Sequence, residues 1–390
     1  MYMLNCDEKY DSNLEVPDFS IRYSNLLNSY KMNIIIIKDD FNHPTFRYRG
    51  FNLFQTMKNN NKYDLNFFNV TELDSLYGLL DKITLVIIQR TPWSFEVENF
   101  INVLKSNNIK VLFDIDDLIY NPKYVPSYLN SISNYTEATM NHMFSLSKRY
   151  EMLAEKCDGF IVTTEFLKKN VEKDFTKPVW VFHNYLNLKQ EKISKEIVSL
   201  KDETYSDEKF IIGYFSGSPS HKRDLEIVES ALLKLMDEYD NIYLKIVGPM
   251  ELSKELKKLK DKGRIIQSNK VSFEELQYEI GKVDLNIIPL QKHNFNECKS
   301  ELKYFESSIV NTLSCATDNE VYKEVINDGI DGFLSDELSW FEKIEHIYLN
   351  QDKLKDIIDN ARIKCYKNYG NKEQENDLEM MFDDIIETLG

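Results

Sequence analysis

The sequence has little of what marks a secreted, membrane-spanning or metal-binding protein. Its five cysteines (Cys6, Cys157, Cys298, Cys315 and Cys365) are scattered and form no CxxC pair, which predicts free thiols in a reducing compartment. No basic stretch followed by an apolar one opens the chain, and the longest apolar runs, near 34–37 and 85–88, are only strand-sized. The six histidines are isolated, without metal-ligand spacing. We therefore expect a cytoplasmic protein that holds no metal and no cofactor.

Positive charge is also scarce. The chain has 48 Lys and Arg against 64 Asp and Glu, a net charge of −16. A general nucleic-acid binder needs a broad basic face, so this class is excluded. An acidic total still permits a local basic pocket for a small phosphate ligand. The frequent Asn, Lys and Ile residues suggest a bacterium of low GC content.

The chain is long enough for two domains of one architecture. It has 390 residues, 42 % of them hydrophobic and 13 % aromatic. Continuous apolar runs alternate with amphipathic stretches, which predicts parallel sheets covered by helices on both faces, an α/β fold. The expected strands are 32–38, 83–89, 109–115, 158–164 and 178–184, then 210–216, 242–248, 263–268 and 283–290.

These runs set the expected domain boundaries. The first Rossmann-like domain covers 1–190, with an irregular lead-in over 1–31, and a charged linker follows over 191–208. The second Rossmann-like domain covers 209–372, and an acidic amphipathic helix over 373–390 could pack back on the first. Ligands of open parallel sheets bind at the carboxyl ends of the strands, so a cleft between the domains is the expected site.

One candidate motif, "FNECKSELKYFE" over 295–306, follows a late strand of the second domain. As a helix, it would place Lys299, Lys303 and Glu306 on one face, at i, i+4 and i+7. The lysines could neutralise a diphosphate, and the glutamate could accept hydrogen bonds from ribose hydroxyls. A solvated helix face with a Lys–Glu pair explains the same residues.

A second motif, "SGSPSHKRD" over 216–224, follows the first strand of that domain. Gly217 and Ser218 allow close backbone approach, and the next helix start offers free N–H groups. His221, Lys222 and Arg223 complete a possible diphosphate cradle. An ordinary strand–helix turn, with Asp224 helping to start the helix, is the alternative.

Two further motifs belong to the first domain. In "FDIDDLIY", the carboxylates of Asp114, Asp116 and Asp117 could supply a general base, orient an acceptor, hold a divalent ion or cap a helix. In "HPTFRYRGFNLFQTM" over 43–57, Arg47, Arg49 and Gly50 precede an amphipathic helix and could meet an anionic ligand. Surface arginines explain the second pattern equally well.

Together these motifs resemble those of a GT-B glycosyltransferase of the "glycosyl transferases group 1" type, in a bacterial branch. The resemblance spans roughly 33–368. It is carried by "FDIDDL" (113–118), "FSGSPSHKRDL" (215–225) and "FNECKSELKYFE" (295–306), with support from "CDGFIVTTEFLKKNV" (157–171) and "PVWVFHNYL" (178–186).

The resemblance implies roles for these residues. It implies two Rossmann-like domains, with a nucleotide-sugar held mainly by the second and no metal. Asp116 falls near the position of a first-domain histidine in related enzymes, and Asp116, Asp117 and Lys299 are the catalytic candidates. The implied acceptor-side residues are Arg47, Arg49, Gly50 and Asp114. The implied nucleotide-sugar residues are Gly217, Ser218, His221, Lys222, Arg223, Lys299, Ser300, Lys303 and Glu306.

The sequence departs from the family pattern at two places. An E-x7-E pair would need glutamate at 298, where this chain has Cys298, and Glu297 is one place off. The usual "GxPVV" segment reads "NTLSCAT" over 311–317, without glycine or proline. These departures concern the contacts to the donor sugar more than the nucleotide site.

The expected function is transfer of a hexose-type unit from a nucleotide-sugar to a cell-surface glycan or a protein such as flagellin. The first expectation for the donor is UDP-GlcNAc, which would transfer GlcNAc. The resemblance implies retention through front-face attack. A UDP-sugar 2-epimerase and a degenerate scaffold for an active transferase are the alternatives. The expected partners are the nucleotide-sugar and its acceptor, without nucleic acid. Association with a membrane surface or a partner enzyme stays open.

Overall fold

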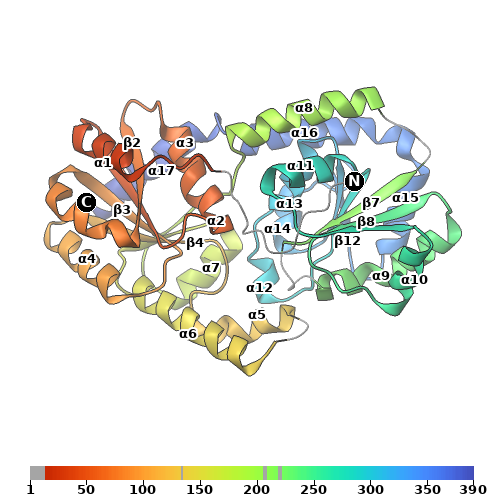
Figure 1. Ribbon diagram of the computed structural model, residues 1–390, viewed down its shortest axis with the longest axis horizontal. Helices are drawn as coiled ribbons and strands as arrows, with labels where there is room; N and C mark the ends of the chain where they lie inside the picture. Colours follow the sequence, from red (N-terminus) through yellow and green to blue (C-terminus); the bar gives the residue numbers. More distant parts are fainter. Residues whose placement is uncertain (1–13, 133–134, 205–208, 218–221) are drawn as a thin grey trace.

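Two six-stranded parallel sheets form the centres of two domains (Figure 1). The computed structural model describes residues 14–132, 135–204, 209–217 and 222–390. The first sheet has the order β2-β1-β3-β4-β5-β6. Its strands are β1 (Met32–Lys38), β2 (Tyr63–Asn69), β3 (Ile83–Gln89), β4 (Lys110–Ile115), β5 (Gly159–Val162) and β6 (Val179–Val181).

The second sheet has the order β12-β11-β10-β7-β8-β9. Its strands are β7 (Phe210–Phe215), β8 (Ile242–Val247), β9 (Ile265–Ser268), β10 (Leu285–Ile288), β11 (Leu313–Thr317) and β12 (Phe333–Ser335). The two orders confirm the predicted α/β class of parallel sheets.

Helices cover both faces of the first sheet because its strands are apolar on both sides. Along β1, Ile34 and Ile36 belong to one buried cluster, and Ile35 and Ile37 belong to another. The helical segments of this domain are α1 (Phe19–Asn28), α2 (Pro44–Phe46), the π-helix η1 (Arg47–Phe51), α3 (Asn52–Met57), η2 (Val70–Lys82), α4 (Phe95–Ser106), η3 (Pro122–Tyr124), α5 (Val125–Ser131), α6 (Glu137–Ala154) and α7 (Glu165–Asp174).

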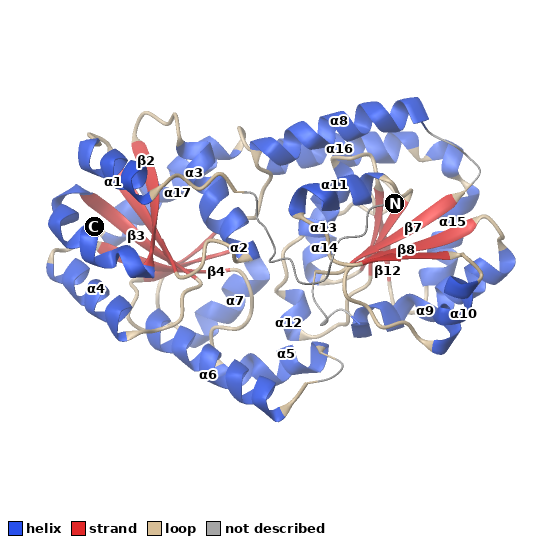
Figure 2. Cartoon of the chain, in the orientation of Figure 1, coloured by secondary structure: helices blue, strands red, loops and turns tan. Residues whose placement is uncertain are grey.

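The second domain repeats this layering with its own helices (Figure 2). They are α8 (Leu188–Thr204), α9 (Lys222–Glu238), α10 (Lys254–Asp261), α11 (Phe273–Gly281), α12 (Asn294–Glu297), α13 (Leu302–Ser308), α14 (Glu320–Val325), α15 (Trp340–Leu349), η5 (Gln351–Lys353) and α16 (Lys355–Tyr369). Figure 1 shows α8 and α16 running along the same side of this domain.

The last helix, α17 (Gln374–Leu389), lies against the first domain. Asp383 accepts hydrogen bonds from Lys62 and Tyr63 at the start of β2, and Asp384 accepts one of 2.5 Å from the indole of Trp180. The ring of Phe382, fully buried, packs against Tyr63. The chain therefore leaves the first domain before α8 and returns to it after α16.

Several boundaries differ from those expected. The lead-in over 1–31 is not irregular throughout, because α1 lies within it and Arg22 on this helix pairs with Glu72. The expected linker over 191–208 is helical over most of its length, because α8 extends through residue 204 and buries Ile193 and Ile197. The strands β2, β11 and β12 were not expected. Among the described residues, no helix is both long and apolar enough to cross a bilayer.

Candidate functional site

The predicted motifs lie at the carboxyl ends of their strands. The turn at 216–217 follows β7, the segment with α12 and α13 follows β10, and Asp116 follows β4. The strands β7 and β10 are neighbours, so their motifs are adjacent. Domain one approaches the same place, because the Tyr48 hydroxyl donates a 2.5 Å hydrogen bond to Glu306 Oε1.

Lys303 and Glu306 lie on α13 and are the central pair of the site. The Nζ atom of Lys303 is buried and has no hydrogen-bond partner among the described residues, and it lies 5.4 Å from the centroid of the Tyr214 ring. Burial, together with the charge of Lys299, lowers the pKa of Lys303 to about 8. A buried amine without a partner is costly, and an anionic ligand would relieve that cost.

Glu306 is buried beside this amine. Burial raises the pKa of its carboxyl to about 7, although the hydrogen bond from Tyr48 and the charge of Lys303 act in the opposite direction. Its backbone carbonyl accepts a hydrogen bond of 2.7 Å from Gln277 on α11. Hydrogen bonds to both the backbone and the side chain therefore hold Glu306 in place.

The expected single helix from Lys299 is wrong, because α12 ends at Glu297 and α13 begins at Leu302. Lys299 lies in the turn between them, where its amine is 5.3 Å from the centroid of the Phe295 ring. Burial lowers the pKa of Lys299. Ser300 in the same turn donates a hydrogen bond of 3.2 Å to Glu301.

A buried carboxylate that the sequence suggested only as a helix start organises this region. Asp224 is 1 % exposed, and its Oδ1 accepts hydrogen bonds from the backbone of Gln291 and the side chain of Asn296. It also interacts electrostatically with Lys299 and Lys303. Asp224 thereby ties the start of α9 to the segment that carries both lysines.

The turn after β7 is only partly described. Gly217 is exposed, and a Cβ there would meet no atom of the described residues within 4 Å, while Ser218 and His221 lie outside the described residues. Lys222 is the first residue of α9. Arg223 turns to the first domain, where its guanidinium donates to the carbonyl of Asn130 at 2.8 Å.

Gly248, which the sequence did not single out, shapes this turn. It follows β8 with φ +115°, and a Cβ there would lie 1.9 Å from the carbonyl oxygen of Ser216. Only glycine therefore fits where the backbones after β7 and β8 approach each other. The signal in the sequence was a glycine directly after an apolar run.

The acidic motif after β4 is arranged differently from the expectation. Asp116 and Asp117 both accept hydrogen bonds from one nitrogen of Arg90, at 2.7 and 2.9 Å. Burial opposes ionisation of Asp116, but Arg90 lowers its pKa. Burial raises the pKa of Asp117, which also interacts electrostatically with Lys299 of the second domain. Arg90 itself has φ +38°, and nothing in the sequence marked it.

Three of the expected acceptor-side residues are buried and make contacts within the first domain. Arg49 is 1 % exposed and forms a 2.6 Å ion pair with Asp114, which is also buried. The same guanidinium donates to the carbonyl of Phe182 at 2.6 Å, so the pair holds η1 on the sheet. Gly50 is needed for packing, because a Cβ there would lie 2.4 Å from the Phe46 ring. All three are thus buried within the first domain.

Arg47, the fourth expected acceptor-side residue, reaches the second domain. Its guanidinium lies 3.4 Å from the centroid of the Phe273 ring, and Arg47 is 3 % exposed. A second contact joins the domains nearby, where His183 and the buried Glu301 are 2.9 Å apart. Phe295 and Cys298 complete the junction by packing into the core of the first domain.

The segment 311–317, which departs from the family pattern, still contains a regular strand. Asn311 has φ +54°, a left-handed conformation that asparagine tolerates better than most residues. The following residues form β11, which pairs with β10 and β12. The missing glycine and proline of the family pattern therefore do not disrupt this strand.

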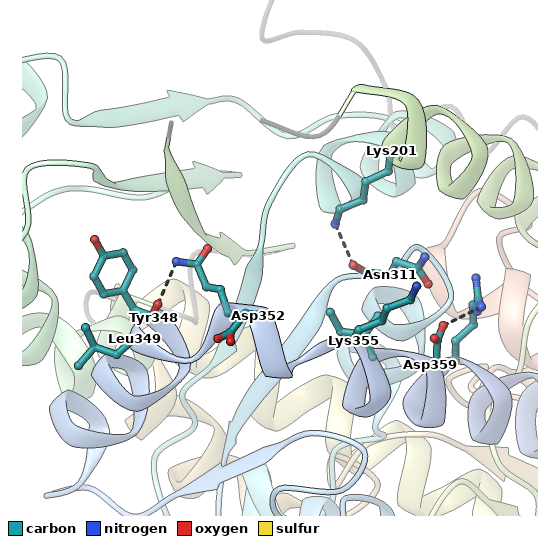
Figure 3. Close-up of a pocket in the computed structure, with 10 residues that line it drawn as sticks. Lys201, Asn311, Tyr348, Leu349, Asp352, Lys355 and Asp359 are labelled. Carbon is teal, nitrogen blue, oxygen red and sulfur yellow. Dashed lines mark hydrogen bonds and ion pairs between the residues drawn. The ribbon is translucent and has the colours of Figure 1, made fainter. Parts of the chain in front are cut away.

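A separate open groove of about 1080 Å³ lies on another part of the second domain (Figure 3). Lys201 points across it to the carbonyl of Asn311 at 2.8 Å, and Asp359 pairs with Arg362 on α16. Its lining includes Asn311 of the 311–317 segment but no residue of the motifs over 43–57, 113–118, 216–224 and 295–306. Among the described residues, no group of three or more His, Cys, Asp and Glu side chains could hold a metal ion.

No family model and no curated protein matches the sequence. Solved structures match the fold. A glycosyltransferase from Rickettsia africae superposes with a TM-score of 0.64 and 14 % identity over 92 % of this chain and 99 % of that one. Anabaena HepE, solved with UDP and glucose, gives 0.57 and 12 % over 90 % and 99 %.

A third match, TarM, gives a TM-score of 0.53 and 16 % identity over 80 % of this chain. The chain spans 57 % of the length of TarM. Together with the two parallel sheets, these similarities decide the architecture. The chain has the GT-B fold. In this GT-B fold, Lys299, Lys303 and Glu306 belong to the second domain, and η1 of the first domain meets that domain at Glu306.

Proposed function

We propose that the chain is a glycosyltransferase that moves a sugar from a nucleotide-sugar to a glycan or protein acceptor without a metal. The observation that carries the proposal is the buried amine of Lys303 beside Glu306, which has no hydrogen-bond partner among the described residues. A diphosphate would supply the missing partner, and a ribose hydroxyl would suit the carboxylate. Solved GT-B neighbours that contain UDP support this reading.

The proposed chemistry uses the lysines as an electrostatic sink. An acceptor hydroxyl attacks the anomeric carbon, the bond to the phosphate oxygen breaks, and the nucleoside diphosphate leaves with the electron pair. Lys299 and Lys303 stabilise the charge that grows on the phosphate. Front-face attack on the donor would let the departing phosphate oxygen take the hydroxyl proton and would retain the anomeric configuration.

UDP is the nucleotide that we propose, with UDP-GlcNAc as the first donor to test. A cell-surface glycan or a surface protein such as flagellin is the proposed acceptor. On the acceptor side, Asp117 is the candidate to orient the hydroxyl, because it interacts with Lys299 across the domain junction. Asp116 is a weaker candidate, because Arg90 holds it in its ionised form.

The test is a donor panel. Thermal shift and donor hydrolysis are measured with UDP-, GDP-, dTDP- and CMP-sugars, with and without EDTA, on the wild type and on Lys303→Ala. We expect one UDP-sugar to raise the unfolding temperature of the wild type and to be hydrolysed by it, also when EDTA is present. Lys303→Ala should lose most of the thermal shift and most of the hydrolysis. Lys234→Ala, which removes an exposed lysine of α9, is the control.

Other outcomes separate the alternatives. Interconversion of the sugar without an acceptor would identify an epimerase. Failure of every donor to bind would favour a scaffold for another transferase. Loss of activity with EDTA that Mg²⁺ or Mn²⁺ restores would contradict the metal-independent mechanism.

A further inference from the structure

Arg90 holds a strained backbone conformation directly after β3. Its φ is +38°, in the left-handed region that residues other than glycine rarely adopt. Neighbouring strands fix both of its backbone polar groups. Its N–H donates to the carbonyl of Asp114 on β4 at 2.8 Å, and its carbonyl accepts from the amine of Lys38 on β1 at 3.1 Å. Strain that the surroundings maintain in this way is typical of functional sites, so it indicates a function for the Arg90 side chain.

The guanidinium of Arg90 joins the two carboxylates that follow β4. One nitrogen, Nη1, donates to Asp116 at 2.7 Å and to Asp117 at 2.9 Å. The strands β3 and β4 are neighbours in the sheet, so these three residues meet at its carboxyl edge. The Nε atom of Arg90 is buried and has no hydrogen-bond partner among the described residues.

Arg49, which lies on η1, is bound in a different way. Its Nε and Nη2 atoms both donate to the single carboxylate of Asp114, at 3.2 and 2.6 Å. Such a two-pronged pair satisfies one buried carboxylate well and suits a structural role. Arg90 instead shares one nitrogen between two carboxylates and leaves a buried N–H unused, which a purely structural arginine has no reason to do.

Asp117 is the carboxylate of this pair that a reacting group can reach. Its side chain is 28 % exposed, against 12 % for Asp116. Within the described part of the chain, its carboxylate accepts a hydrogen bond from Arg90 through Oδ2, and Oδ1 accepts none. The second oxygen is therefore available to an acceptor hydroxyl or to a water molecule.

We propose that Arg90 is a positioning residue, which holds Asp117 with one oxygen open to the acceptor and favours the charged form of its carboxylate. The proposal rests on the proposed function, because it takes Asp117 as the group that orients the acceptor hydroxyl. Burial raises the pKa of Asp117, and the charge of Asp116 adds to this effect, whereas Arg90 opposes both. Without Arg90, Asp117 should lose its position and stay protonated to a higher pH.

The groups that interact electrostatically with Asp117 come from both domains. They are Arg90, Asp116 and Tyr128 of the first domain, and Cys298 and Lys299 of the second. Burial raises the pKa of the tyrosine and of the cysteine, so both are neutral below pH 7. An acidic titration at this place therefore reports on the two carboxylates.

The experiment replaces Arg90 by glycine, the residue that best tolerates its positive φ. Hydrolysis of UDP-GlcNAc, or of the UDP-sugar that the donor panel selects, is followed from about pH 4 to pH 8, with water as the acceptor. We expect Arg90→Gly to lower kcat roughly 10- to 100-fold, to change KM less than about twofold and to move the acidic half-point of kcat to higher pH.

Asn108→Gly is the matched control. Asn108 also has a positive φ, of 60°, in the first domain, and it is exposed. This substitution should change neither kcat, KM nor the half-point. Arg90→Lys keeps the charge and is the second variant if Arg90→Gly does not fold. It should lower kcat less than glycine does and leave the half-point near that of the wild type. A shifted half-point in a folded Arg90→Lys would overturn the proposal.

Unchanged kcat and half-point in Arg90→Gly, with an active wild type, would show that Arg90 is only structural. Absence of hydrolysis by the wild type would instead overturn the proposed function. Titration of Asp117 tests the contact independently of turnover. Carbon-13 NMR of aspartate-labelled protein, with Asp117→Asn for assignment, should give Asp117 a higher pKa in Arg90→Gly than in the wild type. Equal pKa values would overturn the proposal whether or not the wild type is active.

Discussion

Lys303 determines at which pH the proposed site can hold a diphosphate. Its pKa of about 8 in the ligand-free protein means that it loses its proton within the range accessible to experiment. A neutral amine attracts phosphate far less than an ammonium does. The terminal phosphate of UDP is already ionised, with a pKa of about 6, so it does not confuse the measurement.

UDP affinity should therefore fall as the pH rises above about 8. Lys303→Arg keeps its charge at every accessible pH, so its affinity should stay nearly flat between pH 7.5 and 9.5, roughly one decade either side of that pKa. Calorimetry at four pH values checks this. The same decline in Lys303→Arg would show that another group titrates.

Glu306 affects how the folding stability of the protein depends on pH. Its pKa is about 7 in the folded protein against an ordinary value of 4.5, so between these values the folded state binds more protons than the unfolded state. Stability is then highest at low pH and falls as the pH rises. The difference of pKa corresponds to at most on the order of 3 kcal/mol.

Glu306→Gln should remove this dependence without unfolding the protein, and should also weaken UDP binding. The measurement is the free energy of unfolding in urea at pH 5 and pH 8. The pKa of His183 is also raised, because the effect of Glu301 outweighs that of burial, so His183 too makes the protein less stable as the pH rises. Only the difference between wild type and variant therefore reports on Glu306. An identical pH dependence in both proteins would contradict the assignment.

At the scale of elements, the glycine after β8 controls the turn after β7. Gly248 and Gly263 both have positive φ, but only Gly248 lies against another backbone. Alanine at either position strains the chain by about 1 kcal/mol or more. At Gly248 the added Cβ must also push away the carbonyl of Ser216, 1.9 Å from it.

Gly248→Ala should therefore destabilise the protein by clearly more than Gly263→Ala and should weaken UDP binding as well. Gly263→Ala, in open space, should lose only stability. Urea unfolding and calorimetry on both variants test this. Equal effects of the two substitutions would mean that the contact with Ser216 yields without cost.

Elements were predictable from sequence where their pattern was local and strong. The strand β1 reads as four consecutive isoleucines, and its bounds agree with the prediction. In contrast, β2 contains Asp64 and Asn66 among its apolar residues, and β12 has three residues, so neither gave a clear apolar run. The break between α12 and α13 escaped notice because charged residues at helical spacing continue through it.

The part of the site that depends on spacing within one element was predictable from the sequence. Lys303 and Glu306 share a helix, so their proximity follows from spacing of three residues. Other positions depend on contacts far apart in sequence: Arg49 is buried because Asp114 pairs with it, and Tyr48 meets a residue 258 positions away. No pattern within one element carries such information.

At the scale of the whole molecule, α17 brings the C-terminal part of the chain back to the first domain. Phe382 is fully buried against Tyr63, while Met380 on the same helix is 61 % exposed. Phe382→Ala should cost about 3–5 kcal/mol of unfolding free energy, and Met380→Ala should cost little. Thermal unfolding followed by calorimetry checks both.

The location of the loss is a sharper readout than its size. Hydrogen exchange in Phe382→Ala should rise in β2 and α3 of the first domain and stay unchanged in β7 and β8. An increase confined to the second domain would contradict the assignment of α17 to the first.

The return of the chain through α17 also bears on the order in which the protein matures on the ribosome. The backbone N–H of Leu186 donates to the carbonyl of Tyr369 at 2.9 Å, so the exit from the first domain and the way back lie side by side. The second domain is in effect an insertion into the first. It can fold as soon as it has emerged, whereas the first domain, made earlier, waits for α17 to cover Tyr63 and Trp180. The half that is translated first is the half that is completed last.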